Sequence, residues 1–170
     1  MSKSYMRKNN TRIIKYLIES IQQEISSIDE LCSQIDLLIN KAEQADEESK
    51  IFYKRTAGSI LHDFYTGIEK IFREIAIKID EGLPKGENWH IELLKSMATP
   101  NEKRDAVISQ ELMEKLKQYL GFRHLFRNIY GMELEWDKLK ILLTKIRDDV
   151  WKKFKVEINL FVKWLKETID

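Results

Sequence analysis

The sequence predicts an all-α protein, an antiparallel bundle of about four long helices with one or two short ones. Apolar residues recur every three or four positions over long stretches, as on the buried face of an amphipathic helix. Only two prolines and six glycines occur in 170 residues, which leaves few turns for a β-rich fold. With 43% hydrophobic and 34% charged residues, the composition is that of a folded chain rather than a disordered one.

Length, charge and cysteine content limit the classes of protein that fit. We expect a single domain over 1–170, with 1–10 flexible. The chain has 29 Lys+Arg and 28 Asp+Glu, so a protein held to nucleic acid by bulk charge is excluded, whereas a local basic site is not. A single cysteine allows no internal disulfide, and no run of six apolar residues occurs. We therefore expect a cytoplasmic protein without a membrane segment.

Two long helices are expected in the first half of the chain. The first starts near Thr11, and its apolar seam alternates steps of four and three: Ile14, Ile18, Ile21, Ile25, Ile28, Cys32, Ile35, Ile39 and Ala42. Because Cys32 lies in this seam, we expect a core thiol rather than a nucleophile. The polar stretch 43–50 predicts a turn, and the second helix spans about 51–79 before the Gly- and Pro-rich stretch 81–86.

The second half predicts shorter helices followed by one long helix. Apolar spacing favours a short helix around 89–97. The stretch 99–102, Thr-Pro-Asn-Glu, has the form of a capping box with proline at the first helical position, and it predicts a helix start. Ser109 is a candidate cap for the next helix, and Gly131 is a candidate end. The stretch 134–169 contains neither Gly nor Pro, so we expect one continuous helix there.

The usual catalytic motifs are absent. There is no Gly-rich phosphate loop, GxSxG, HExxH or CxxC pattern. The three histidines, His62, His90 and His124, are widely scattered, with no His or carboxylate set at ligand spacing. We therefore expect no metal and no cofactor. For His62 and His90 we favour a surface or hydrogen-bonded structural role.

One segment of the chain is locally basic. This segment, residues 115–127, contains no acidic residue. It carries four cations, Lys115, Lys117, Arg123 and Arg127. On a straight helix, Arg123, Arg127 and Tyr130 fall on one face, whereas His124 and Asn128 share a neighbouring face. Such a segment is either a phosphate-binding surface or a solvated face with arginine stems packed over the bundle. The residues alone leave both interpretations open.

Three stretches carry a resemblance to a known family. The first is Phe122-Arg123-His124-x-x-Arg127-x-x-Tyr130, followed by Glu133-Leu134-Glu135-Trp136. The second is Leu61-His62-Asp63-Phe64-Tyr65-x-Gly67-Ile68-Glu69-x-Ile71-Phe72. The third is Gly82-Leu83-Pro84-x-Gly86-Glu87-x-Trp89-His90-x-Glu92-Leu93-Leu94. Together they cover most of the chain from about 50 to 145, and they resemble HepT-like toxins of the HEPN superfamily.

The resemblance implies a helical bundle that dimerises and acts as a metal-independent endoribonuclease. The superfamily signature is an arginine, four to six residues and then a histidine, and HepT-like toxins have the form Arg-x4-His-x-Tyr. The implied partner is a minimal nucleotidyltransferase antitoxin, which transfers AMP to the motif tyrosine and inactivates the toxin. Matched by position, the arginine is Arg123 and the tyrosine is Tyr130, while His124 occupies the polar position that often follows the arginine.

The chain departs from this signature at the histidine position, where it has Asn128. RNA cleavage without a metal needs proton transfer at the 2′-hydroxyl and at the leaving 5′ oxygen, and a cation at the phosphate. Arg123 and Arg127 suit the phosphate, but asparagine cannot exchange a proton near pH 7. Losing that help costs about 10²–10⁴-fold in rate. With His124 as a candidate substitute, we expect an inactive or strongly impaired enzyme.

Helix geometry bears on how such a site is completed. Residues five apart on a helix point about 140° apart, so Arg123 and Asn128 do not converge on one straight helix. Either the helix breaks near Gly131, or a two-fold dimer brings two motifs into one groove; we favour the dimer. Three hypotheses remain: a toxin subunit that binds RNA, a non-enzymatic HEPN-like module that binds a nucleotidyltransferase, and a structural helical dimer.

Overall fold

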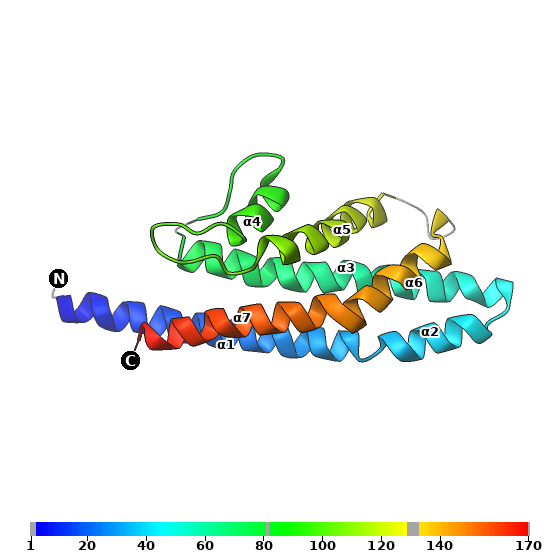
Figure 1. Cartoon of the computed structure of the whole chain (residues 1–170), viewed down its shortest axis with the longest axis horizontal. Helices are drawn as coiled ribbons and strands as arrows, with labels where there is room; N and C mark the ends of the chain where they lie inside the picture. Colours follow the sequence, from blue (N-terminus) through cyan, green and yellow to red (C-terminus); the bar gives the residue numbers. More distant parts are fainter. Residues whose placement is uncertain (1–2, 81, 129–132, 170) are drawn as a thin grey trace.

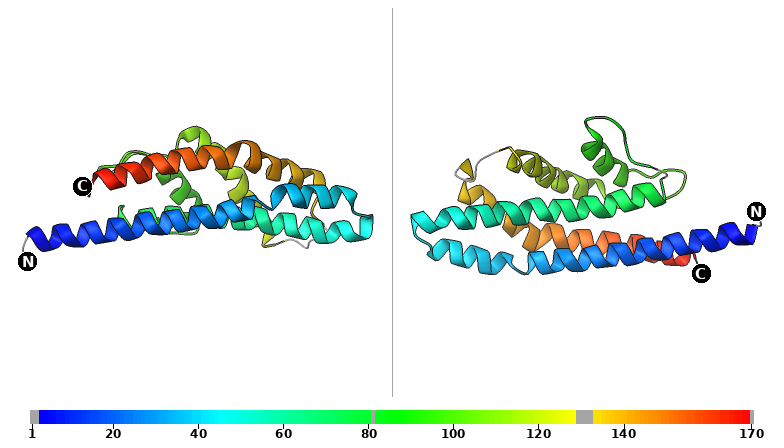
Figure 2. Two further views of the ribbon diagram at one scale, coloured as in Figure 1. Left: turned by 90° about the horizontal axis from the view of Figure 1, so that it is seen from below. Right: turned by 180° about the vertical axis from the view of Figure 1, so that it is seen from behind.

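The computed structural model describes residues 3–80, 82–128 and 133–169. These residues form helices joined by turns and loops, with no strand among them, so the predicted all-α fold is confirmed. α3 (Glu47–Lys78) runs along the bundle with α1 (Lys3–Cys32) and α2 (Ile35–Gln44) on one side (Figures 1 and 2). α4 (Trp89–Met97) and α5 (Gln110–Phe126) pack on its other side. α3 is therefore the element that connects the two halves of the bundle.

The first predicted helix is interrupted. α1 begins at Lys3 rather than near Thr11 and ends at Cys32, and α2 continues the apolar seam from Ile35. At the break, the hydroxyl of Ser33 donates to the carbonyl of Glu30 at 2.6 Å. The predicted turn in 43–50 is present, where the Asp46 side chain accepts from the backbone N–H of Ser49 at 2.7 Å and caps α3.

The prediction of a helix start at 99–102 is wrong. Residues 98–109 form a loop, in which the Asn101 side-chain oxygen accepts from the N–H of Lys103 at 2.8 Å and of Arg104 at 3.1 Å. This local bonding competes with helix formation. The buried Arg104 also ties the loop to Asp80 at 2.6 Å. α5 starts where Ser109 was expected to cap it, with its hydroxyl oxygen accepting from Leu112 N–H at 3.2 Å.

The predicted long C-terminal helix is present but contains a wider turn. α6 (Trp136–Lys145) leads into a π-helical turn, η2 (Ile146–Val150), and then α7 (Trp151–Glu167). A π turn accommodates an extra residue within a helix, which re-aims the side chains that follow it. α7 lies against α1 with the opposite chain direction, so the bundle is antiparallel (Figure 1).

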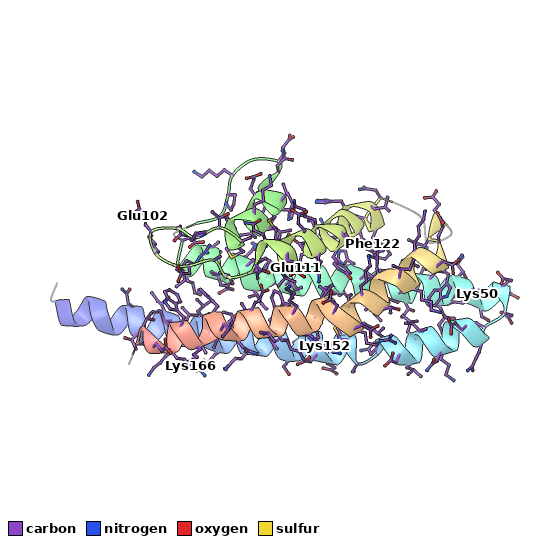
Figure 3. The ribbon with its side chains drawn as sticks, viewed as in Figure 1. Lys50, Glu102, Glu111, Phe122, Lys152 and Lys166 are labelled. Atoms are coloured by element: carbon purple, nitrogen blue, oxygen red, sulfur yellow. The ribbon has the colours of Figure 1, made fainter. Side chains whose placement is uncertain are left out.

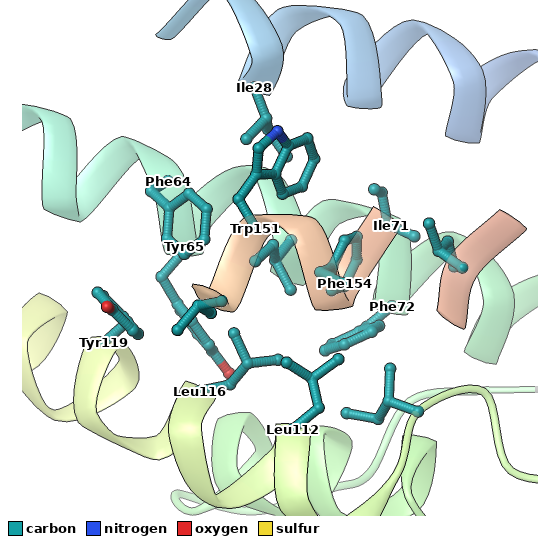
Figure 4. Packing of buried hydrophobic residues seen from close by; sticks show 14 of the residues in the cluster. Ile28, Phe64, Tyr65, Ile71, Phe72, Leu112, Leu116, Tyr119, Trp151 and Phe154 are labelled. Carbon is teal, nitrogen blue, oxygen red and sulfur yellow. The ribbon is translucent and has the colours of Figure 1, made fainter. Parts of the chain in front are cut away.

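Aromatic side chains from α3, α5 and α7 fill the centre of the bundle (Figure 4). The rings of Phe64 and Tyr119 meet edge to face with centroids 5.2 Å apart, and Trp151 stacks on Phe154 at 5.5 Å. Cys32 packs half-buried against this core, and burial raises the pKa of its thiol to about 12. This is the environment of the core thiol that its place in the seam predicts. No helix among the described residues has the length and apolarity needed to span a bilayer.

Candidate functional site

Three ionisable side chains from three helices meet where α4 packs beside α3 and α5. Arg123 of α5 donates from Nη1 to Oε2 of Glu69 on α3 at 2.7 Å, and His90 Nδ1 lies 2.6 Å from the same oxygen. Glu69 is 4% exposed and Arg123 is 5% exposed. A buried carboxylate is stable only when paired, and here a guanidinium and an imidazole share it. We call these three residues the Glu69 cluster.

The hydrogen bonds within the Glu69 cluster fix the imidazole tautomer. A carboxylate beside a guanidinium only accepts hydrogen bonds, so Nδ1 of His90 carries the proton that it donates to Glu69. Arg123 Nη1 lies 3.2 Å from the same ring nitrogen, but both are donors that converge on one acceptor. The Nε2 atom of His90 is then the ring nitrogen that can accept a proton.

Aromatic rings hold the His90 imidazole from two sides. The Trp89 ring stacks on it with centroids 3.6 Å apart, and the His124 ring stands edge-on at 5.5 Å. The Arg73 guanidinium lies 5.5 Å from the centre of the Trp89 ring, within the range of a cation–π contact. The orientation of His90 is therefore set both by its bond to Glu69 and by packing.

His124 lies on the exposed side of this group. Partial burial lowers its pKa, and the charges of His90, Arg123 and Arg127 lower it further, against an opposing effect of Glu69. His124 therefore favours the neutral form more strongly than a free histidine does. Its backbone carbonyl accepts from the Asn128 side-chain Nδ2 at 2.9 Å, so the Asn128 amide caps the end of α5.

α5 ends at Phe126, before the motif ends. Arg127 follows as the C-cap, and the backbone N–H of Asn128 bonds to the carbonyl of Leu125 at 2.9 Å. Both Arg127 and Asn128 are exposed. The straight helix assumed from the sequence does not reach these residues, and the helix ends earlier than the expected break near Gly131. Tyr130 and Gly131 lie outside the described residues.

Most of the locally basic segment is paired with acids. Lys115 binds Glu111 at 2.9 Å and Asp149 at 2.7 Å, and Lys117 binds Glu114 at 2.6 Å. Arg123 is committed to Glu69, whereas no ion pair of Arg127 is found among the residues the structure describes. The charge count along the sequence did not reveal these ion pairs, because the acidic partners lie outside the segment. Of the four cations of this segment, Arg127 is therefore the one left at the surface without an ion pair among the described residues.

Among the predicted site residues, the structure links three to one another and to His90. Asn128 bonds to the backbone of His124, whose ring contacts His90, and Arg123 shares a carboxylate with His90. Phe122, labelled in Figure 3, marks this part of α5. Arg127 follows directly at the helix end. The catalytic and RNA-binding roles of these residues stay predictions.

Sequence reasoning missed Glu69 and assigned His90 only a structural role. A signal for Glu69 was present, since it lies four residues after Tyr65 and three before Phe72, on the apolar face of α3. An acid on such a face needs a partner. Within the described ranges, no three His, Cys, Asp or Glu side chains are grouped as metal ligands.

A comparison with protein families identifies the chain. Residues 56–165, more than half of the sequence, match the model of a family described as HepT-like protein. The chain belongs to the HepT-like family of the HEPN superfamily. The resemblance predicted from the sequence is thereby confirmed. Neither the curated proteins nor the solved structures contain a match to the sequence.

Membership in the HepT-like family indicates the general role of this protein. It indicates a component of a HEPN-type toxin–antitoxin system. The matched region begins within α3 and ends within α7. It therefore contains the whole Glu69 cluster together with His124 and Asn128.

Proposed function

We propose that this chain is the toxin subunit of a toxin–antitoxin pair and acts in the cytoplasm on RNA. The observation that carries the proposal is the gathering of Arg123, His90 and His124 around the buried Glu69, inside the region that matches the HepT-like family. Two imidazoles and a guanidinium at one place can supply the proton transfer and the positive charge that phosphodiester cleavage requires.

The phosphate contact in this proposal falls mainly to Arg127. Arg127 is exposed at the C-terminal end of α5, four residues after Arg123 of the Glu69 cluster, and its guanidinium suits a phosphate through paired N–H donors. Arg123 is buried with Nη1 bonded to Glu69, so in this proposal it supplies positive charge near the phosphate rather than the main contact. A two-fold dimer doubles this small set of cations, in keeping with a chain of net charge +1.

Asn128 limits the proposed reaction. The position that the family signature gives to histidine holds an amide that donates to the His124 carbonyl and cannot exchange a proton near pH 7. The proposed enzyme is therefore impaired by about 10²–10⁴-fold relative to a chain with histidine at this position. Its proposed partner is a minimal nucleotidyltransferase that transfers AMP to Tyr130.

The test is to restore the signature histidine. Expression of Asn128→His from an inducible promoter is expected to arrest growth, because an imidazole at this exposed position regains proton exchange. The parent chain and Asn128→Gln, which keeps an amide there, serve as matched controls and should permit growth. Normal growth with a soluble, folded Asn128→His protein would contradict the toxin function.

A second function is favoured by the burial of Arg123. Because its guanidinium is 5% exposed and bonded to Glu69, the cluster also fits a structural tie within a non-enzymatic module that binds a nucleotidyltransferase. The discriminating experiment is incubation with the cognate transferase and ATP, followed by mass spectrometry of the peptide containing Tyr130. The toxin subunit is expected to gain AMP on Tyr130. A stable complex without modification would favour the binding module.

A further inference from the structure

We propose that His90, held by Glu69, is the residue that accepts the proton in RNA cleavage by this chain. The inference rests on the proposed function and assigns its acid–base step to a residue outside the Arg-x4-His-x-Tyr pattern. In this proposal, asparagine instead of histidine at position 128 lowers the rate of cleavage, but the site still has a general base in His90.

The His90 imidazole is oriented to accept a proton at Nε2. Nδ1 of His90 is bound to Glu69 Oε2 at 2.6 Å, so the lone pair of the neutral ring is on Nε2. A carboxylate bonded to one ring nitrogen fixes the tautomer and stabilises the imidazolium that forms when the other nitrogen takes a proton. The Trp89 ring, stacked at 3.6 Å, holds the plane of the imidazole.

The hydrogen bonding of the His90 ring is incomplete at Nε2. The His90 side chain is 15% exposed, and no hydrogen bond to Nε2 is found in the part of the chain that the structure describes. Arg123 already balances the charge of Glu69, so the ion pair does not require His90 as a counter-ion. A histidine with only a structural role would more commonly have both ring nitrogens bonded.

His90 lies close to other groups that suit a phosphate. His124 stands edge-on to its ring at 5.5 Å and is exposed, and Arg127 is exposed at the same end of α5. Asn128 donates an amide hydrogen bond to the His124 backbone, so it lies at the same end of the helix. The charge of Arg127 acts on His124, whose ring contacts that of His90, so the proposal places a phosphodiester bound at Arg127 near the two imidazoles.

The proposed step is an intramolecular displacement at phosphorus. Nε2 of His90 takes the proton of the RNA 2′-hydroxyl, and the 2′ oxygen forms a bond to phosphorus. The bond from phosphorus to the 5′ oxygen breaks, and that oxygen takes a proton from water. The products are a 2′,3′-cyclic phosphate and a 5′-hydroxyl, and His90 then returns its proton to the resulting hydroxide. No oxidant, reductant or further co-reactant is needed.

The experiment follows cleavage of an end-labelled single-stranded RNA by the purified full chain in the presence of EDTA. The parent chain is expected to cleave slowly and to leave the same RNA with 2′-O-methyl groups intact. His90→Gln, which cannot accept the proton, is expected to lower the rate by about 10²-fold or more. His62→Gln is the matched control, because His62 also bonds a neighbouring carboxylate, that of Asp63 at 3.1 Å, and should keep the parent rate.

A second measurement covers the case in which His90→Gln does not fold. The cleavage rate of the parent chain is expected to rise with pH until an imidazole loses its proton. The pKa obtained from this pH dependence should equal the pKa of His90 measured by NMR. The NMR signal of His90 can be assigned because the chain has three histidines. Disagreement between the two values would overturn the assignment to His90.

The outcomes separate this inference from the proposed function. An unchanged rate in folded His90→Gln would overturn the role of His90, and so would cleavage by Asn128→His together with an inactive parent chain. In both cases the RNA-cleaving function would stand. If neither the parent chain nor Asn128→His cuts RNA, the proposed function fails and the inference fails with it.

Discussion

Glu69 and Arg123 form an ion pair that is almost fully removed from water, although the two residues lie 54 positions apart in the chain. Burying two charges is costly, and the attraction between them repays this cost only while both partners are present. His90 adds a third group to the same carboxylate oxygen. The consequence is an asymmetry between the two partners, because Glu69 keeps His90 if Arg123 is removed, whereas Arg123 keeps no carboxylate if Glu69 is removed.

This asymmetry gives a stability prediction. Glu69→Gln is expected to lower the free energy of unfolding by about 3–5 kcal/mol, because it leaves a buried guanidinium without a counter-ion. Arg123→Met should cost less, and the double variant should be more stable than Glu69→Gln alone. Urea denaturation measures all three, with Lys117→Met as the control at the exposed pair with Glu114. Equal losses for Glu69→Gln and Lys117→Met would contradict the burial of the pair.

The residues of the site were predictable only in part. Arg123, His124 and Asn128 stand close together in the sequence, so one motif identifies them as candidates. Glu69 and His90 reach the same place from 54 and 33 positions before Arg123 in the chain. No local spacing encodes such contacts, because they depend on how α3, α4 and α5 pack. The family resemblance covered both residues but gave neither a role.

At the scale of elements, α3 determines where the site forms, because it contacts α1 on one side and α4 and α5 on the other. Gly67 permits the close approach of α1: a Cβ at this position would lie 2.8 Å from two carbons of the Ile28 side chain. Ile28 is buried and cannot move aside freely. Two residues further along α3, Glu69 begins the cluster, so the packing of α1 also supports the site.

A substitution at this contact tests the packing of α1 on α3. Gly67→Ala is expected to destabilise the protein, because overpacking costs about 1–3 kcal/mol and outweighs the roughly 1 kcal/mol gained in helix propensity. Gly121→Ala in α5 is the matched control, since nothing lies within 4 Å of the added carbon and the gain in propensity should appear alone. Thermal unfolding followed by circular dichroism separates the two. Stabilisation by Gly67→Ala would contradict the close contact.

Helix positions were predictable where apolar periodicity was long and uninterrupted. The second helix, the short helix after it and the helical character of 134–169 follow directly from that pattern. The pattern gave no sign of the break at Ser33, because the seam continues in phase into α2. The helix start expected at Thr99 failed since Asn101 makes a competing turn and Arg104 anchors the loop to Asp80. Capping patterns state a local preference, which tertiary contacts can override.

At the scale of the whole molecule, nearly equal numbers of cations and acids are arranged so that the basic segment is mostly neutralised. Lys115 and Lys117 pair with carboxylates at the surface, and Arg123 pairs with a carboxylate inside. RNA binding by this chain would therefore rest on few phosphate contacts, and its dependence on salt should be shallow. The two-fold dimer and the number of cations it would gather stay predictions.

The proposed RNA-cleaving site of this HepT-like chain lies at the Glu69 cluster and is impaired by Asn128. The most direct measurement is the rate at which purified Asn128→His cuts an end-labelled RNA in EDTA, relative to the parent chain. We expect an increase of about 10²–10⁴-fold, with a 2′,3′-cyclic phosphate at the new end. A folded Asn128→His protein that leaves the RNA intact would contradict it.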